Sequence, residues 1–310
     1  MNLNVSIIII NYNGKDLLKN CLSSLFKFTK DITFEIILID NNSSESLDDL
    51  LKEFHNIKFI KNEKNLGFAA ANNQGIKLSK GKYILFLNND TVFFENTIKK
   101  IFDFVESIDR PVFVGCQLLN SDNSHQESVV EFPNIWNTFT ENFFLYKMFP
   151  KSKVFNKYYQ NFQIHENPIE VDVIKGAFMF CDADAVKNLN GFDERFFFYS
   201  EETDLCYRFK KIHGGKVILF PSCKIYHYGG TKDNEYNWFR IKNLSVGKIQ
   251  FYQKHFHHVK FFIIVFIHYV GIFVRVIYNI LLGIILVSKT KIRKGFYFFK
   301  SLFIYPKNNF

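Results

Sequence analysis

The chain has 310 residues, of which 47% are hydrophobic, and it carries a formal net charge of +9. This length allows one large domain or two, and the hydrophobic content excludes an intrinsically disordered chain. The five cysteines are scattered without a CxxC spacing, which argues against a zinc site or a disulfide framework and is typical of buried thiols in a reducing cytoplasm. The apolar run near the N-terminus is too short for a signal peptide.

The N-terminal part of the chain alternates between apolar runs typical of buried strands and segments with helical periodicity. Strands and helices are predicted in turn at residues 5–10, 15–28, 34–39, 47–54, 57–60, 69–79 and 83–87. This alternation predicts an α/β fold with a doubly wound, mostly parallel sheet.

Polar side chains follow three of the predicted strands. Asn11 follows the first strand, Asp40 ends the second, and Asp90 comes shortly after the fourth. Right-handed crossovers bring the ends of parallel strands to one edge of the sheet, where open α/β sheets bind ligands. A carboxylate there can hold a hard cation such as Mg²⁺ or Mn²⁺, and through it a diphosphate. An aspartate after a strand is also a common helix N-cap, so this signal leaves two interpretations open.

The middle of the chain, residues 111–230, is less periodic. It contains predicted strands at 112–119, 171–181 and 216–220, a predicted helix at 201–211, and an aromatic-rich helical or loop excursion at 134–159. In the predicted helix, Asp204 and Arg208 have the i,i+4 spacing of an ion pair. His227 follows the last predicted strand.

Taken together, these segments resemble the family 2 glycosyltransferases, the inverting enzymes of GT-A fold, and most closely their rhamnosyltransferase-like bacterial members. The matching pieces occur in the family's order over residues 5–231, and they are VSIIIINYN, the strand ending in Asp40-Asn41, NLGFAAANNQG, YILFLNNDT, GAFMF and GFDERFFFYSEETDLCYR, followed by His227. The resemblance implies transfer of a sugar from a nucleoside-diphosphate sugar to a hydroxyl group of a glycan.

The resemblance also implies which residues bind the nucleotide sugar. Asn11 and Tyr12 match residues that contact the nucleotide base. Asp40 matches the carboxylate that accepts a hydrogen bond from the base. Asn65 and Gly67 match the loop that lies over the nucleotide, where a glycine lets the backbone come close.

A second group of matching residues concerns the metal and the chemistry. Asp90 matches the last residue of the family's DxD motif, which holds the metal, and His227 matches a position near the metal or the pyrophosphate. Asn88 replaces the first acid of that motif, so we assign it to the nucleotide-sugar site. Glu202 matches the usual general base, with glutamate in place of aspartate, and Glu201 is the alternative base.

Purely structural roles remain open for the same residues. Acids at the start of the helix predicted at 201–211 can complement the helix dipole, and residues 40–43 can form a capping loop. A histidine after a strand, here His227, is more often structural.

The C-terminal region combines an apolar run with a basic cluster. Residues 261–288 are long enough to span a bilayer, but Arg275 near the middle makes a full span cost about 2.5–3.5 kcal/mol. We predict instead an interfacial or re-entrant pair of helices around Gly271 and Arg275. No acid follows Glu235, and the basic residues expected to hold anionic lipid are Lys289, Lys291, Arg293, Lys294, Lys300 and Lys307.

This region is therefore expected to be a peripheral or monotopic anchor on the cytoplasmic face of the bacterial inner membrane. A full span, a buried helix of the soluble domain and a dimer interface are the alternatives, so a homodimer remains compatible with the sequence. Lipid is favoured over nucleic acid as the partner of the basic tail, because the apolar run adjoins it.

The predicted organisation is a catalytic domain at residues 1–230, with a nucleotide-binding half at 1–105 and an acceptor-side half at 106–230, followed by a membrane-associating region at 231–310. The predicted function is an inverting glycosyltransferase of bacterial surface polysaccharide biosynthesis that uses a lipid-linked glycan acceptor. A sugar-1-phosphate nucleotidyltransferase is one alternative. A catalytically inactive glycan-binding or scaffold protein that retains the fold is another, and Asn88 keeps it open.

Overall fold

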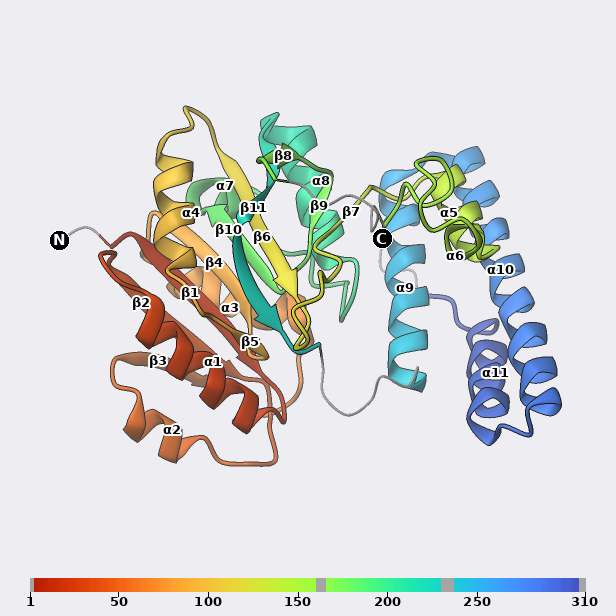
Figure 1. Cartoon of the computed structure of the whole chain (residues 1–310), viewed down its shortest axis with the longest axis horizontal. Helices are drawn as coiled ribbons and strands as arrows, with labels where there is room; N and C mark the ends of the chain where they lie inside the picture. The colour runs from red at the N-terminus through yellow and green to blue at the C-terminus, as the bar shows by residue number, and fades with distance from the viewer. Residues whose placement is uncertain (1–2, 160–165, 230–236, 307–310) are drawn as a thin grey trace. The chain divides into compact units, whose positions relative to one another are not determined.

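The computed structural model describes residues 3–159, 166–229 and 237–306. By their internal contacts these residues form two compact units (Figure 1). The α/β unit contains residues 3–130, 166–197 and 201–229, and the helical unit contains residues 131–159, 198–200 and 237–306. Residues 131–159, which the sequence analysis assigned to the catalytic domain, therefore belong with the C-terminal helices.

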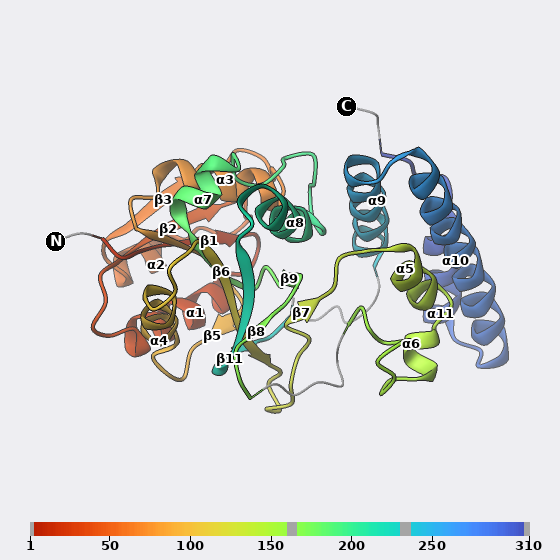
Figure 2. The same ribbon diagram turned by 90° about the horizontal axis from the view of Figure 1, so that it is seen from above.

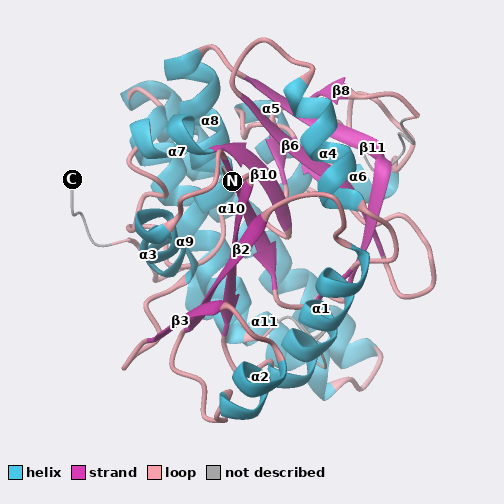
Figure 3. Cartoon of the chain, turned by 90° about the vertical axis from the view of Figure 1, so that its left-hand side faces the viewer, coloured by secondary structure: helices cyan, strands magenta, loops and turns pink. Residues whose placement is uncertain are grey.

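The α/β unit is built on a mixed sheet with nine described strands, and Figure 3 shows these strands in magenta. Their order is β3-β2-β1-β4-β10-β6-β11-β5, and β8 pairs with β11. The strands are β1 (Val5–Asn11), β2 (Phe34–Asp40), β3 (Ile57–Lys61), β4 (Tyr83–Asn88), β5 (Thr91–Val92), β6 (Val112–Leu119), β8 (Ile169–Glu170), β10 (Phe178–Asp182) and β11 (Lys216–His227). A separate two-stranded ribbon consists of β7 (Val129–Val130) and β9 (Val173–Ile174).

The four N-terminal strands β1 to β4 are parallel to one another, as predicted. β6 and β11 are also parallel, whereas β10 runs antiparallel between β4 and β6. The predicted fold class, a mostly parallel α/β sheet, is confirmed.

Helices cover both faces of this sheet, with α1, α2 and α4 on one face and α3, α7 and α8 on the other (Figures 1 and 2). Their bounds are α1 (Lys15–Phe28), α2 (Asp48–Glu53), α3 (Phe68–Leu78), α4 (Thr97–Glu106), α7 (Ala183–Asn188) and α8 (Glu201–His213). Both faces are therefore shielded from water, which is why the strands read as continuous apolar runs.

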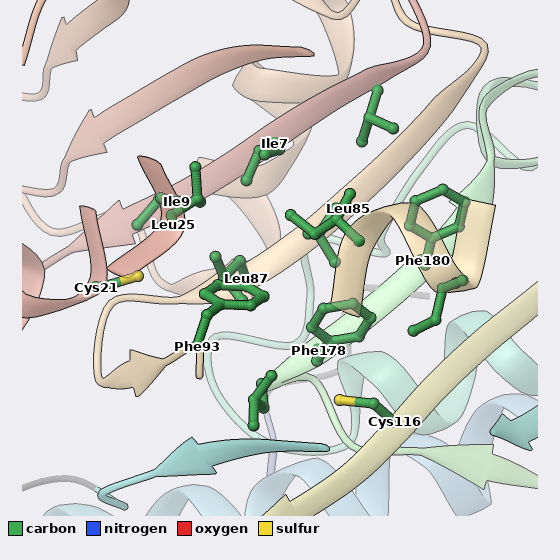
Figure 4. Close-up of a cluster of buried hydrophobic side chains, with 14 of the residues drawn as sticks. Ile7, Ile9, Cys21, Leu25, Leu85, Leu87, Phe93, Cys116, Phe178 and Phe180 are labelled. Carbon is green, nitrogen blue, oxygen red and sulfur yellow. The ribbon is translucent and has the colours of Figure 1, made fainter. Parts of the chain in front are cut away.

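Alternate residues of β1 pack into the two different layers. Ile7 and Ile9 belong to the same buried cluster as Cys21 and Leu25 of α1 (Figure 4). On the other face, Gly75 of α3 approaches β1 so closely that an added Cβ would lie 2.6 Å from Ile8. Packing from both sides fixes the register of β1, because a shift by one residue would exchange its two faces.

Two predicted strands differ from the observed ones. The predicted strand at 171–181 is interrupted at residues 175–177, where the chain turns between β9 and β10. The predicted strand at 216–220 extends to His227, with an irregularity between Phe220 and Lys224. Pro221 lies in this irregularity and cannot donate a hydrogen bond to the neighbouring strand, so the sequence predicted that the strand ends there. In the structure, β11 pairs with β6 again from Lys224 onward.

The helical unit consists of α5 (Ile135–Asn142), α6 (Leu145–Met148), α9 (Trp238–His255), α10 (His258–Ile285) and α11 (Lys289–Ser301). The prediction of a re-entrant pair of helices around Gly271 and Arg275 is wrong, because α10 is one continuous helix. Gly271 marks a close helix contact and not a turn: an added Cβ there would lie 2.3 Å from Asn142 of α5. Lys307, the last residue of the predicted basic cluster, lies outside the described residues.

Arg275 is accommodated by hydrogen bonds to α5. Its guanidinium donates to Asn142 Oδ1 at 2.7 Å and to the Glu141 carbonyl at 2.9 Å. The Glu141 carboxylate in turn accepts from Lys248 Nζ of α9 at 2.6 Å. Burial alone would raise the pKa of Glu141, but the charges of Lys248 and Arg275 hold it at about 2.

His268 is the second buried polar residue of α10. Its Nε2 lies 2.9 Å from Ser245 Oγ of α9. Burial lowers the pKa of His268 to about 3, and the neighbouring Lys248 charge adds to this effect. The folded protein therefore keeps this imidazole neutral.

We expect this neutral histidine to make stability fall with acidification. Between pH 6.5, its ordinary pKa, and about pH 3, the unfolded chain binds a proton that the folded chain does not. Lowering the pH from about 7 to about 5.5 should cost about 1 kcal/mol through His268 alone. Urea unfolding followed by circular dichroism should show this loss in the wild type and a smaller loss in His268→Asn. His258→Asn, at an exposed position of α10, serves as the control; equal pH dependence in all three proteins would contradict the assignment.

Candidate active site

The carboxyl ends of β1, β2 and β4 lie side by side at one edge of the sheet. The parallel register pairs Asn11 with Asp40, and it pairs Ile10 with Asn88. Beyond β4, the Asn89 side chain donates to Asn11 Oδ1 at 2.8 Å. The structure thus brings together the strand-end residues that the sequence analysis singled out.

Asp40 and Asn11 are buried at this edge, whereas Tyr12 is 52% exposed. Asp40 Oδ1 accepts a hydrogen bond from the Ser43 backbone at 3.3 Å, and Asn11 Nδ2 donates to Ser43 Oγ at 3.0 Å. Residues 40–43 therefore form a local turn, as in the capping interpretation. The same turn holds the buried Asp40 carboxylate. Tyr12, the residue after Asn11, has an exposed ring that offers a flat apolar face to a ligand.

The loop before α3 is organised by Asn41, to which the sequence analysis gave no role. Its Nδ2 donates to Asn65 Oδ1 at 2.9 Å, and its Oδ1 accepts from the Leu66 backbone at 3.0 Å. Gly67 has a positive φ of 83°, and an added Cβ would lie 2.4 Å from the Phe197 carbonyl oxygen. The close approach that requires glycine here is thus to the protein's own backbone.

Asp90 lies in the turn between β4 and β5 and faces His227, the last residue of β11. Asp90 Oδ1 is 3.3 Å from His227 Nε2. Asp90 does not cap a helix, because the next helix, α4, has Asn96 at its N-cap. The Asn88 side-chain amide lies 3.3 Å from the same Nε2 atom, so Asn88 contacts the histidine directly.

Gln126 orients this histidine, and the sequence analysis missed it. Gln126 Oε1 lies 2.5 Å from His227 Nδ1, while its Nε2 donates to Asn120 Oδ1 at 2.9 Å and to the His227 carbonyl at 3.1 Å. These two bonds fix which end of the Gln126 amide faces the ring. Nδ1 therefore carries a proton, and Nε2 is the ring nitrogen that faces Asp90.

The Asp90–His227 pair fits a divalent cation. Two ligands about 2.1 Å from one ion, at angles between octahedral and tetrahedral, are roughly 3.0–3.4 Å apart, and the observed separation is 3.3 Å. The Gln126 contact is the kind of outer-shell hydrogen bond that orients a metal-binding histidine. Within the described residues no three His, Cys, Asp or Glu side chains gather as a metal site, so other ligands would have to come from phosphate or water.

Glu201 and Glu202 begin α8, after two residues with strained backbone. Tyr199 and Ser200 have positive φ values of 71° and 73°, which side chains other than glycine rarely adopt and which concentrate at functional sites. Glu201 is buried, and Glu202 is only partly buried. Burial, together with the charge of Glu202, raises the pKa of Glu201 well above its ordinary value. Of the two glutamates, Glu201 is therefore the one whose protonated form is favoured.

Residues 176–177 connect this glutamate pair to the end of β4. The Asn88 backbone donates to the Ala177 carbonyl at 3.1 Å. A Cβ added at Gly176 would lie 3.7 Å from Phe68 and 4.0 Å from Glu202 Cβ. Glu202, the start of α3 and the β4 end thus share one short segment as a neighbour, although they are far apart in the sequence.

The predicted pair within α8 also forms and anchors the helix. Arg208 Nε donates to Asp204 Oδ2 at 2.7 Å. The other guanidinium nitrogens donate to the carbonyls of Leu189 and Gly191, at 2.8 and 2.7 Å. Asp204 is fully buried, so this ion pair holds α8 in place beneath the two glutamates.

Comparison with protein families and known proteins agrees with this architecture. The model of "Glycosyl transferase family 2" matches residues 6–184, more than half of the chain. The chain therefore belongs to glycosyl transferase family 2, and the predicted family is confirmed.

Individual relatives are more distant. Rhamnosyltransferase WbbL of Escherichia coli is 28% identical over 232 residues, which cover 72% of this chain and 83% of that protein. An uncharacterized glycosyltransferase of Methanocaldococcus jannaschii is 34% identical over 109 residues, 33% of this chain and 37% of the relative. A poly(ribitol-phosphate) beta-glucosyltransferase of Bacillus spizizenii is 32% identical over 117 residues, 36% of this chain and 18% of the relative. The chain thus spans well under half the length of two of these relatives.

Solved structures share the fold. GalNAc-T7 with UDP, GalNAc and Mn²⁺ superposes with a TM-score of 0.58 at 18% identity, over 78% of this chain and 47% of that one. TarS 1–349 of S. aureus in complex with UDP superposes with a TM-score of 0.53 at 14% identity, over 79% of this chain and 65% of that one. At these identities the similarity establishes the fold alone.

The role of Gln126 can be tested by metal binding. Gln126→Ala removes the acceptor for the Nδ1 proton and should weaken Mn²⁺ binding about 10-fold, the usual minimum for loss of an outer-shell partner. Gln126→Glu keeps an oxygen at that position and should retain binding. Electron paramagnetic resonance of free Mn²⁺, titrated with protein in the presence of UDP, measures both. Equal affinities for the wild type and Gln126→Ala would contradict an orienting role.

Proposed function

We propose that this chain is an inverting glycosyltransferase that moves a sugar from a nucleoside-diphosphate sugar to a hydroxyl group of a glycan. The observation that carries the proposal is the common neighbourhood of three features: a buried carboxylate at the β2 end, an aspartate–histidine pair beyond β4, and a partly exposed glutamate at the start of α8. Each provides one requirement of the reaction, namely recognition of the base, support of the diphosphate and removal of a proton.

On the donor side, Asn11, Tyr12 and Asp40 would bind the nucleotide base. The buried Asp40 carboxylate is suited to accept a hydrogen bond from a base N–H, and the exposed Tyr12 ring can pack against the base. Asn65 and Gly67, held by Asn41, would border the nucleotide. A uracil, thymine or guanine base satisfies this chemistry.

Asp90 and His227 would hold Mg²⁺ or Mn²⁺ together with the diphosphate, and Asn88 would contact the nucleotide sugar beside them. The bound ion would offset the negative charge that develops on the departing diphosphate. An imidazole ligand is better suited to Mn²⁺ than to Mg²⁺, so we propose that Mn²⁺ is the more effective ion.

Glu202 is the proposed general base. The acceptor oxygen forms a bond to the anomeric carbon on the face opposite the diphosphate, while the carbon–oxygen bond to the diphosphate breaks and its electron pair leaves with the phosphate. The Glu202 carboxylate takes the proton of the acceptor hydroxyl. Burial raises the pKa of Glu201 well above its ordinary value, so Glu201 is the less suitable base of the two.

The proposed acceptor is a lipid-linked glycan at the cytoplasmic face of the bacterial inner membrane, in surface polysaccharide biosynthesis. The names of the relatives support a glycan acceptor: one is a rhamnosyltransferase and another glucosylates poly(ribitol-phosphate). The apolar helix α10 supports a membrane location. Asn88, in place of a second carboxylate, keeps a catalytically inactive glycan-binding protein as the alternative outcome of the tests below.

The two glutamates should respond differently to conversion to glutamine. Glu202→Gln removes the base and should lower kcat by about 10²–10⁴-fold while donor affinity changes little. Glu201→Gln replaces a protonated acid by a neutral group of the same shape and should lower kcat by less than about 10-fold. Release of the nucleoside diphosphate, measured over a panel of UDP-, dTDP- and GDP-sugars with Mn²⁺, gives kcat and KM. The reverse pattern would make Glu201 the base, and no turnover by the wild type with any donor and glycan acceptor would favour the inactive alternative.

The metal pair can be tested by removing or adding one carboxylate. Asp90→Asn should weaken Mn²⁺-dependent nucleotide binding at least about 10-fold, because it removes the one acid of the pair. Asn88→Asp adds an acid beside His227 and should strengthen Mn²⁺ binding. Calorimetric titration of each protein with nucleotide, carried out once in the presence of Mn²⁺ and once in the presence of EDTA, measures both effects. Unchanged Mn²⁺ dependence in Asp90→Asn would refute the assignment.

A further inference from the structure

Helix α10 buries a side that includes polar residues and exposes a side that is apolar. His268, Arg275 and Asn279 lie on the side that packs against the helical unit, and Asn279 Nδ2 donates to the Arg275 carbonyl at 2.7 Å. Six large apolar side chains at helical spacing form the opposite side, here called the outer face: Phe262, Phe266, Phe273, Ile277, Leu281 and Ile284. α10 is long and apolar enough to cross a membrane, and only 28% of its most apolar stretch is buried inside the protein.

A helix that covers a water-soluble core has a polar outer side. The inner side of α10 packs Ile264, Ile272 and Val276 against the rest of the helical unit in the usual way, but its outer side is apolar as well. Phe262, Phe266 and Ile284 are 66%, 69% and 62% exposed. The apolar surface continues around the end of the helix to Val287, which is 89% exposed. An exposed apolar surface of this length marks a site of interaction.

The positive charge of the C-terminal helices indicates which partner covers the outer face of α10. The described C-terminal part of the chain, residues 237–306, contains no acidic residue. Lys260 lies in the first turn of α10, two residues before Phe262, and Lys289 at the start of α11 follows Val287 by two residues. Lys291 and Lys300 also belong to α11. Burial, with further repulsion from Lys291 and other cations, lowers the pKa of Lys294 to about 8. A second copy would present the same cations to this surface, whereas anionic lipid headgroups would neutralise them.

The inner face of α10 excludes a simple membrane crossing. Arg275 near the middle of the helix is hydrogen-bonded to Asn142 and Glu141 of α5, and His268 is bonded to Ser245 of α9. α9 also carries Lys248, which pairs with Glu141. If α10 crossed a bilayer, the charged side chains of Arg275, Lys248 and Glu141 would be drawn into the hydrocarbon region, where a charge at the centre of a span costs about 2.5–3.5 kcal/mol.

We propose that α10 lies in the plane of an anionic membrane surface, with its outer face inserted into the boundary between headgroups and acyl chains and the lysines of α11 at the headgroups. Helices of this kind insert about 5–10 Å. This proposal rests on one part of the proposed function, the location at the membrane. It does not depend on the roles proposed for Glu202 and Asp90.

Binding of the full chain to vesicles tests the surface. We expect co-sedimentation with vesicles of phosphatidylcholine and phosphatidylglycerol, and much weaker binding to phosphatidylcholine alone. Replacing Phe262, Phe266 and Phe273 together by Ser should reduce the partition coefficient at least about tenfold. Ile212→Ser changes an equally exposed residue of α8 and is the matched control. Circular dichroism and Mn²⁺-dependent UDP binding without lipid, unchanged in the triple variant, show that folding and the donor site are intact.

Depth measurements test the orientation. The five native cysteines are buried, so nitroxide labels can be placed at Phe262→Cys, Phe273→Cys and Ile284→Cys in turn. Power saturation with oxygen and a nickel chelate should report the same shallow depth for all three labels. A deep label at position 273 between two shallow ones would overturn the proposal in favour of a span. Absence of vesicle binding, with dimerisation that the triple variant abolishes, would overturn it in favour of a second copy as the occupant.

Discussion

Parallel pairing of β1 with β2 and β4 is the constraint on which the rest of the α/β unit depends. It places Asn11 opposite Asp40 and brings the β4 end alongside them, so residues distant in the sequence become neighbours. The register is held by packing on both faces, where α1 contacts Ile7 and Ile9 and the glycine of α3 admits Ile8. The apolar core thus determines where the polar site residues lie.

Two pairs of ionisable residues, Glu201 with Glu202 and Asp90 with His227, determine the chemistry that this site can support. In each pair, the surrounding residues give the two members different properties. In the glutamate pair, burial favours the protonated form of Glu201. In the aspartate–histidine pair, Gln126 holds the proton on Nδ1 and turns the other nitrogen toward Asp90. In each pair the surroundings thus set one member apart from the other: burial separates Glu201 from Glu202, and the Gln126 contact separates Nδ1 from Nε2 of His227.

The sequence was a good guide where structure is local. The helices and parallel strands of residues 5–88 follow from apolar periodicity, and the placement of Asn11, Asp40 and Asp90 at one edge follows from the handedness of the crossovers. Tertiary contacts account for what it did not predict. The antiparallel insertion of β10 depends on a turn at Gly176–Ala177. Gln126 reaches His227 from a hairpin closed by the Leu119–His125 bridge, which the sequence analysis did not predict. In α10, Gly271 resembled a break because its close contact with Asn142 is invisible in the sequence.

The most direct test of a single site at this sheet edge is a crystal structure of the protein with Mn²⁺ and whichever of UDP, dTDP and GDP binds most tightly. We expect an ion in contact with Asp90 and His227, a base that contacts Tyr12 and Asp40, and a diphosphate that points toward Glu202. A nucleotide bound elsewhere, or an ion that touches neither Asp90 nor His227, would contradict this expectation.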